Sequence, residues 1–382
     1  MLLRLLTSAG ADPNHRHHVV SLTSLGPVGV HLKAHGISVE TLRMRSGLGL
    51  PLLFIRLIRA IRRQHPDVVQ TWMYHADLLG GLAARLCGIK SVVWGVRTTD
   101  VGQGNARATA FIQRACALIS RSVPAAIVYV ANSARAAHEL IGYAPEKAVV
   151  IPNGYPLAKP PASQREVRTR LNIPDGAVVI GSVGRLNDAK DHRTFVKAAA
   201  IVAEARPDCI FLMLGRGVEW SSHALAEWIA ETGRQDQFKL LGEVADVGSH
   251  LAAMDIFCLH SVSEAFPNVV AEAMNMALPC AVTDVGDAAL LVANTGRIAP
   301  PANPDALACA IRELIDLDHA GREHLGQLAQ ERISLHFSIG AARRRYAALY
   351  ERLLGRTTLP QAAPGRNERS QSGRNTSEPA EF

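Results

Sequence analysis

The feature that most constrains this 382-residue chain is a regular alternation of short apolar runs with amphipathic stretches. Such alternation predicts strand–helix–strand units whose strands pair in parallel. Five runs in each half read as strands: HHVVSLTS, PDVVQTW, KSVVWGV, AAIVYVANS and KAVVIPN, then AVVIGSVG, CIFLMLG, FKLLGE, DIFCLHS and PCAVTDV. The pattern therefore predicts an α/β protein with two successive doubly wound, Rossmann-like domains.

Breaks in this pattern give the expected domain boundaries. Residues 151–168 collect four prolines and a glycine without periodicity, which is typical of a linker. After Leu354 the chain becomes polar and nearly free of large apolar residues, so we expect disorder there. The predicted division is a first domain over 1–155, a linker over 156–174, a second domain over 175–338, a helix over 339–355 that packs back on the first domain, and a disordered tail over 356–382.

The start of the chain does not fit the pattern. A doubly wound domain normally opens with a buried strand and a glycine-rich turn. Here Met1 is followed by LLRLLTS, which reads as part of an amphipathic helix. We expect that the first strand of the N-terminal domain is missing from this sequence and that the natural protein begins upstream of Met1.

Composition excludes several classes of protein. Hydrophobic residues make up 48% of the chain and charged residues 20%, as in a globular protein with a buried core. No apolar run approaches the roughly 18 residues of a membrane span, and no signal peptide is recognisable, so we expect a cytoplasmic protein. The six cysteines form no Cys-x-x-Cys pair and the histidines no His-Glu-x-x-His pattern, so we expect no metal site.

Positive charge is concentrated in the first half. Residues 1–155 hold 17 lysines and arginines against 7 acids, whereas the remainder holds 24 against 27. This asymmetry indicates an anionic partner, with nucleic acid, an anionic membrane and a phosphorylated acceptor as the alternatives. The arginine-rich helix predicted over LPLLFIRLIRAIRRQ could lie on a membrane. Packing of its Leu/Ile stripe on the sheet, with solvated arginines, is the interpretation we favour.

The most informative stretch is SEAFPNVVAEAMNMALPCAVTDVGD, residues 263–287. Pro267 suits the first turn of a helix, and the amides of residues 268–270 would then point out of the helix N-terminus, where they bind phosphate. Glu264 precedes that helix and Glu272 lies within it, and carboxylates accept hydrogen bonds from sugar hydroxyls. The predicted ligand is a phosphate flanked by sugars, as in a nucleotide-sugar.

A second stretch supplies cations for the same ligand. GSVGRLNDAKDH, residues 181–192, reads as a strand end, a turn and a helix. Arg185 and Lys190 would lie at the carboxyl edge of the strand, where open α/β sheets bind ligands. Two cations beside a diphosphate would neutralise the charge that develops as it leaves.

Together these stretches resemble family 4 glycosyltransferases, retaining enzymes of the GT-B fold, in which two parallel Rossmann-like sheets face each other across a cleft. The resemblance covers roughly residues 15–350 and rests on matching positions in the two stretches above, with Asn132-Ser133 and Asn153-Gly154. It implies that Arg185, Lys190 and Glu264 act in catalysis. It also implies donor contacts from Gly184, Glu243, Val244, Phe266, Pro267, Asn268, Val269 and Glu272, and no required metal or other cofactor.

Acceptor-side candidates come from the first domain. His75 and Asp77 follow a predicted strand and could position an acceptor, although Asp77 is equally suited to cap a helix. Arg97 lies in WGVRTTD, where the family often has a histidine after the arginine and this chain has Thr98. Position 265 is alanine where the family usually has glycine, a change that could tighten the loop.

The predicted function is transfer of a sugar from a nucleotide-sugar, with UDP-linked sugars favoured, to a growing polysaccharide or lipid-linked glycan. We expect no nucleic-acid partner and possible contact of the basic domain with the inner face of the cell membrane. Three alternatives remain: a sugar-nucleotide epimerase, a truncated non-catalytic nucleotide-binding protein, and a hydrolase that uses Glu264 and Glu272 as an acid and nucleophile.

Overall fold

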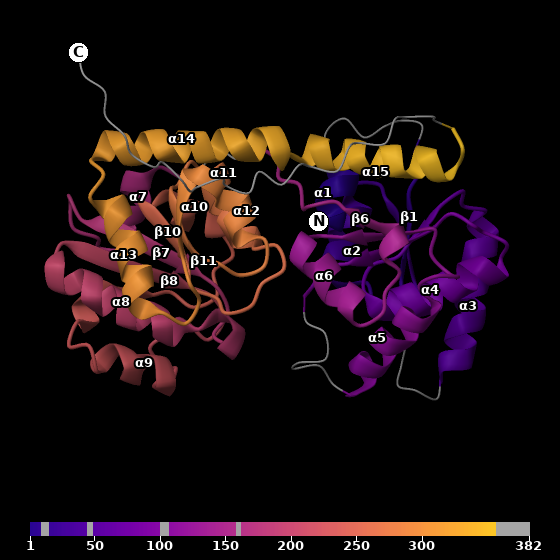
Figure 1. The fold of residues 1–382 in the computed structure, drawn as a ribbon, viewed down its shortest axis with the longest axis horizontal. Coiled ribbons are helices and arrows are strands. Elements are labelled where there is room, and N and C mark those ends of the chain that lie inside the picture. Colours follow the sequence, from indigo (N-terminus) through magenta and orange to yellow (C-terminus); the bar gives the residue numbers. More distant parts are fainter. Residues whose placement is uncertain (9–14, 44–48, 100–106, 158–161, 357–382) are drawn as a thin grey trace, which may run out of the picture.

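The structure is a computed structural model that describes residues 1–8, 15–43, 49–99, 107–157 and 162–356. The chain forms two Rossmann-like α/β units, each with parallel strands (Figure 1). The predicted tail, all but its first residue, lies outside the described residues.

The C-terminal unit is built on a six-stranded parallel sheet with the order β12-β11-β10-β7-β8-β9. The four central strands β11, β10, β7 and β8 are short, mainly apolar runs that are almost entirely buried, as expected for a parallel sheet covered by helices. The strands are β7 Val178–Val183, β8 Cys209–Leu214, β9 Phe238–Leu240, β10 Ile256–Leu259, β11 Cys280–Thr283 and β12 Gly296–Ala299. The helices are α8 His192–Ala205, α9 His223–Ala230, α10 Val247–Ala252, α11 Asn268–Asn275, α12 Ala288–Val292 and α13 Pro304–Ile315.

In the N-terminal unit the strands form two separate parallel sheets, β1-β2 and β3-β4-β5-β6. The strands are β1 His18–Ser21, β2 Ser38–Thr41, β3 Val69–Gln70, β4 Val92–Val96, β5 Ala126–Tyr129 and β6 Ala148–Val150. The helices are α1 Leu2–Thr7, α2 Gly26–Ala34, α3 Leu50–Gln64, α4 Tyr74–Leu86, α5 Arg107–Ile119 and α6 Asn132–Leu140. The chain opens in helix α1, and among the described residues no strand precedes it.

The predicted linker is not irregular throughout. Residues Gln164–Arg170 form helix α7, which packs on α10. Its start is fixed by a capping box, in which the Ser163 hydroxyl accepts from the amide of Glu166 and the Glu166 carboxylate accepts from the amide of Ser163. The linker predicted over 156–174 therefore contains a helix, which the lack of periodicity in residues 151–168 did not indicate.

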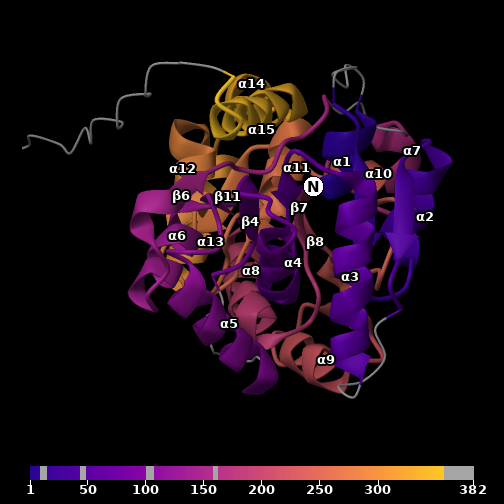
Figure 2. The same ribbon diagram turned by 90° about the vertical axis from the view of Figure 1, so that its right-hand side faces the viewer.

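Two helices at the end of the described chain join the units. Helix α14, His319–His336, runs along the C-terminal unit and packs on α11, and α15, Ile339–Leu353, continues along the N-terminal unit (Figures 1 and 2). Tyr346 and Leu349 of α15 belong to the same buried cluster as Val93 and Val128 of the N-terminal sheet.

Candidate functional site

The candidate site lies where the order of the C-terminal sheet reverses. Strand β7 has β8 on one side and β10 on the other, so the connections after β7 and β10 leave the sheet in opposite directions. A crevice at the carboxyl ends of the strands forms at such a point. The loop after β7 carries Arg185 and Lys190, and the loop after β10 carries Glu264.

These two loops are joined by an ion pair. The Lys190 ammonium donates to the Glu264 carboxylate, and both side chains are largely buried. The same oxygen of Glu264 accepts from the Ser261 hydroxyl at 2.8 Å, and the amide of Val262 donates to the carbonyl of Ala189 at 2.9 Å. Sequence reasoning placed both charged residues in the site but did not predict that they pair.

Arg185 is placed differently from Lys190. Its side chain is exposed and forms no ion pair within the described part of the chain. The loop therefore presents one cation engaged with Glu264 and a second that is free to meet an anion.

Two glycines allow the loops of this edge to approach. At Gly215, which has φ +144°, an added Cβ would stand 2.0 Å from the carbonyl oxygen of Gly184. At Gly286, with φ +59°, it would stand 2.5 Å from the carbonyl oxygens of Glu264 and Ala265. Larger side chains are excluded at both positions. Ala265 itself does not adopt a positive φ, so alanine there causes no backbone strain.

The N-terminus of α11 differs by one residue from the prediction. Pro267 is the N-cap rather than a first-turn residue, and its carbonyl accepts from the amide of Val270 at 3.1 Å. The expectation that the Val270 amide is free is therefore wrong. Within the described residues the amides of Asn268 and Val269 have no partner, so these two point out of the helix as an anion site requires.

Phe266 does not face the ligand side of this helix. Its ring is buried and lies 5.6 Å, between ring centroids, from that of Phe337. Any contribution of Phe266 to a ligand therefore comes from its backbone.

A polar network from the N-terminal unit reaches the start of α11. The side-chain oxygen of Asn268 accepts from the Asn153 amide at 2.7 Å and from the Tyr155 hydroxyl at 2.5 Å. Asn153 in turn accepts from the Arg97 guanidinium, which lies 5.0 Å from the centre of the Trp72 ring. Arg97, predicted on the acceptor side, is thus linked through Asn153 to the proposed phosphate end of the site.

Glu272 is engaged by the first helix of the chain. Its carboxylate forms an ion pair of 2.6 Å with Arg4 of α1, and the Arg4 guanidinium also lies 4.8 Å from the centre of the Tyr155 ring. Both charged side chains remain about one-third exposed. The acid expected to bind ribose hydroxyls therefore has a cationic partner in this structure.

The loop expected to meet the base follows β9. Gly242 has φ +67°. Its carbonyl accepts from the amide of Gly215, and its amide donates to the carbonyl of Val218. The Glu243 carboxylate pairs with Arg216 at 3.1 Å on the open surface, and Val244 is partly buried. The backbone of this loop is thus anchored to the turn after β8, beside the Gly184 turn.

The side chains of His75 and Asp77 lie in different environments. His75 is exposed, whereas the Asp77 carboxyl is fully buried, accepting from the Thr71 hydroxyl at 2.5 Å and the Gly95 amide at 3.3 Å. Burial raises the pKa of Asp77 to about 8. Asp77 is not the helix cap, which is Met73, and it cannot contact an acceptor while buried, so both readings of this residue are wrong.

Two functional candidates were missed because they have no local motif. His260, directly after β10, is buried; its Nδ1 faces the Lys190 carbonyl and its Nε2 the Ser182 hydroxyl. Since a carbonyl only accepts, Nδ1 carries the proton and Nε2 accepts from Ser182. Burial, followed by the neighbouring His192, lowers the pKa of His260 to about 3. The neutral ring therefore holds the backbone of Lys190.

Asp287 is the second missed residue, and it connects the two units. Its carboxylate accepts from the amides of Asn132 and Ser133 at 2.7 and 2.9 Å, at the start of α6. The loop that carries Asp287, in the C-terminal unit, thereby provides a hydrogen-bond acceptor for two amides at the start of α6 in the N-terminal unit.

Within the described ranges, no group of three or more His, Cys, Asp or Glu side chains is arranged to hold a metal ion. Among the described helices, none combines the length and apolar character needed to cross a membrane.

Comparison with known proteins gives two family matches and a set of relatives. Residues 2–159 match the family model described as Glycosyltransferase Family 4, and residues 177–317 match that described as Glycosyl transferases group 1. The chain is 26% identical over 246 residues to UDP-Gal:alpha-D-GlcNAc-diphosphoundecaprenol alpha-1,3-galactosyltransferase of Escherichia coli, covering 63% of each. It is 30% identical to 2-deoxystreptamine glucosyltransferase of Streptomyces kanamyceticus, covering 51% of each.

The chain spans between about half and just under two-thirds of the length of these curated relatives. Among solved structures, HepE of Anabaena in complex with UDP superposes with a TM-score of 0.78 at 21% identity, over 91% of this chain and 94% of that one. A glycosyltransferase from Rickettsia africae gives 0.73 at 19% identity, over 89% and 91%. These likenesses confirm the predicted GT-B fold.

Proposed function

The chain belongs to the family 4, or group 1, glycosyltransferases, and we propose that it moves a hexosyl or hexosaminyl group from a nucleotide-sugar to a glycan or lipid-linked acceptor, with retention of anomeric configuration. The observation that carries this proposal is the edge where Lys190 meets Glu264 beside the unpaired Arg185. A nucleotide-sugar places an anionic diphosphate directly beside sugar hydroxyls, and this edge offers cations beside a carboxylate.

The proposed chemistry follows from the charge that develops on the donor. As the bond between the anomeric carbon and the diphosphate oxygen breaks, negative charge grows on that oxygen, where Arg185 and Lys190 stabilise it. The oxygen takes the proton of the acceptor hydroxyl, which attacks the anomeric carbon from the same face. One glycosidic bond forms, one sugar–phosphate bond breaks, and the nucleoside diphosphate leaves with the proton.

The remaining residues would each contact a different part of the donor. The amides of Asn268 and Val269 would receive the distal phosphate, and Glu264 would accept a hydroxyl of the transferred sugar. Glu272 would bind the ribose hydroxyls once these replace its partner Arg4. The loop at Gly242–Val244 would face the base. We propose that the reaction needs no metal, since the cationic side chains supply the charge compensation.

The relatives suggest the donor and acceptor classes. The name of one relative gives a UDP-galactose donor and a GlcNAc-diphosphoundecaprenol acceptor. Another relative is named as a lipopolysaccharide core biosynthesis mannosyltransferase. From these names we propose that this chain uses a UDP-sugar donor and a lipid-linked or polysaccharide acceptor. We also propose that it acts at the cytoplasmic face of a membrane.

The test is a transfer assay with the full chain. UDP-galactose, UDP-glucose, UDP-N-acetylglucosamine and GDP-mannose are each incubated with and without a prenyl-diphosphate-linked N-acetylglucosamine, in EDTA and in Mg²⁺. We expect nucleoside diphosphate release that needs acceptor, is indifferent to EDTA and yields an α-linked product by NMR from an α-linked donor. An altered sugar formed without acceptor would identify an epimerase, and binding without turnover would identify a non-catalytic protein.

A further inference from the structure

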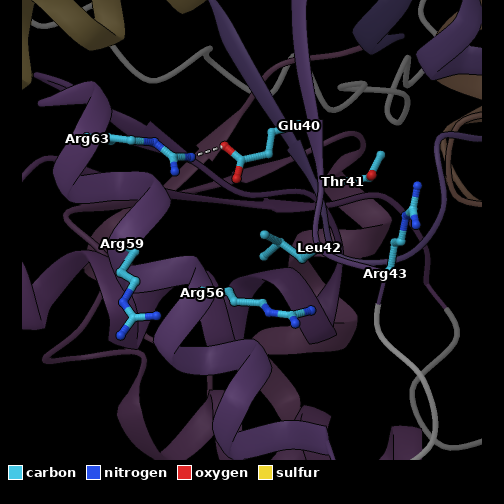
Figure 3. Close-up of a pocket in the computed structure, with 7 residues that line it drawn as sticks. All are labelled: Glu40, Thr41, Leu42, Arg43, Arg56, Arg59 and Arg63. Atoms are coloured by element: carbon cyan, nitrogen blue, oxygen red, sulfur yellow. Dashed lines mark hydrogen bonds and ion pairs between the residues drawn. The ribbon is translucent and has the colours of Figure 1, made fainter.

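An open hollow lies in the N-terminal unit, between the end of β2 and helix α3. Its volume is about 330 Å³, and four exposed arginines line it together with Glu40, Thr41 and Leu42 (Figure 3). We call it the arginine pocket: Arg43, Arg56, Arg59 and Arg63 around Leu42. None of these residues belongs to the loops that hold Lys190 and Glu264, or to helix α11, which holds Glu272.

The pocket is formed by the packing of α3 against the core. Leu53, Leu57 and Ile61 recur at the spacing of one helix face and are buried. This places Arg56, Arg59 and Arg63, also three and four residues apart, together on a face that lines the opening. Arg43 comes from the opposite wall, directly after Leu42, with φ +51° and its amide bonded to the carbonyl of Thr23.

Charge in the pocket is only partly compensated. The Arg63 guanidinium pairs with Glu40 at 2.6 Å, as Figure 3 shows. Arg43, Arg56 and Arg59 have no carboxylate partner in the described part of the chain. Three guanidinium groups without a carboxylate partner along one hollow favour the binding of an anion, and the planar fork of arginine matches phosphate in two-point hydrogen bonds.

Two exposed aliphatic side chains accompany the pocket arginines on α3. Leu52 and Ile55, which flank Arg56 and Arg59 on α3, are 52% and 45% exposed. A cluster of guanidinium groups next to exposed aliphatic side chains fits a phosphoryl group attached to a hydrocarbon chain better than it fits a free sugar.

We infer that the arginine pocket binds a phosphate or diphosphate group, carried by the acceptor or by a lipid at its side. This inference rests on the proposed function, because it gives that acceptor a recognised anionic group at a site apart from the donor diphosphate. A cavity of about 330 Å³ has room for a diphosphate with part of the group it carries.

The test separates this pocket from the donor site. Inorganic diphosphate is titrated by calorimetry into the full chain in the presence of saturating UDP, which fills the donor diphosphate position. We compare the wild type, the double variant Arg56→Gln/Arg59→Gln, and the control Arg62→Gln, an exposed arginine of α3 outside the pocket. We expect binding to weaken on the order of tenfold for each pocket arginine removed, and to be unchanged in the control. Equal affinity of the double variant and the control overturns the inference.

A second arm identifies the source of the phosphate. Vesicles of phosphatidylcholine with phosphatidylglycerol are compared with phosphatidylcholine alone. Retention of the wild type, but not of the double variant, on the anionic vesicles assigns the pocket to a lipid headgroup. Loss of diphosphate binding in the double variant, with vesicle binding absent throughout, assigns it to the acceptor's own phosphate. Both results support the inference.

Failure of the pocket and failure of the proposed function are distinguishable. Binding of nucleotide-sugars, measured by calorimetry, reports the donor site alone, and acceptor-dependent release of nucleoside diphosphate reports transfer. If transfer occurs while the double variant binds diphosphate as tightly as Arg62→Gln, the pocket assignment fails and the function stands. If diphosphate binding depends on the arginines but every donor stays unbound, the proposed function fails and the pocket stands.

Discussion

Lys190 and Glu264 form a largely buried ion pair between the loop that follows β7 and the loop that follows β10. The two residues are 74 positions apart, and the pair links the two loops at the point where the sheet order reverses. Because the charges already neutralise each other, an incoming diphosphate must share Lys190 with Glu264. The pair therefore orients the lysine before the donor arrives.

Removal of the lysine tests this role. We expect Lys190→Ala to lower kcat by roughly 10²- to 10³-fold, the usual cost of losing one group that stabilises developing charge, with a smaller change in donor KM. Lys197→Ala, at an exposed lysine of α8, is the matched control and should leave both constants unchanged. A wild-type kcat in Lys190→Ala would exclude Lys190 from the chemical step.

His260 is expected to act by positioning Lys190. His260→Val removes the donor to the Lys190 carbonyl, and we expect a loss of about tenfold or more in kcat because small displacements of catalytic groups are costly. His260→Asn, whose amide can still donate to that carbonyl, should recover part of the rate. Since the wild-type ring has a pKa near 3, the rate profile between pH 5 and 9 should have the same shape in all three proteins. Equal rates for the valine and asparagine variants would contradict positioning through this hydrogen bond.

Arg4 is expected to compete with the donor for Glu272. Arg4→Gln frees the carboxylate, and a partly exposed ion pair contributes up to about 1 kcal/mol, so we expect donor KM to fall by up to about fivefold. Glu272→Ala should raise donor KM instead. Arg16→Gln, at an exposed arginine, serves as the control. A donor KM that rises in Arg4→Gln would show that Arg4 itself contacts the donor.

Asp287 is expected to hold the two units together. Asp287→Ala leaves the Asn132 and Ser133 amides without their acceptor, and loss of such a cap costs about 1 kcal/mol. We expect hydrogen exchange at these amides to become about fivefold faster and donor KM to rise. The exposed neighbour Asp284 provides the control, Asp284→Ala. Unchanged exchange at both amides would mean that they are protected without Asp287.

The fold was predictable where buried residues form an apolar run or stripe in the sequence. Fully apolar runs such as CIFLML predicted β8, and the stripe of LPLLFIRLIRAIRRQ predicted α3 over its observed bounds. Strands β2 and β12 were missed because SVET and GRIA are short and carry charged residues. Their pairing in the sheets, rather than local propensity, makes them strands.

The site was predictable only where a loop carries its own motif. Glu264 and Lys190 were found from their neighbours in sequence, but no local pattern announces that Arg4 meets Glu272, 268 residues away. Asp77 shows the opposite failure: it follows a strand, as acceptor-side residues do, yet the helix turns its carboxyl inward. Which face a single polar residue occupies depends on packing that the sequence pattern does not specify.

Asp77 gives a prediction for stability against pH. Its folded pKa of about 8 lies above the ordinary value of a carboxyl, so the folded state holds a proton that the unfolded state releases. The stabilisation is full below about pH 4 and is lost as pH rises through 8, by at most about 1.4 kcal/mol per pH unit. Asp77→Asn cannot ionise, so the free energy of unfolding of the wild type should fall relative to this variant between pH 5 and 8. Urea titrations at each pH measure this, with exposed Asp175→Asn as the control. A difference between wild type and Asp77→Asn that is constant across this range would mean that the buried carboxyl is already ionised.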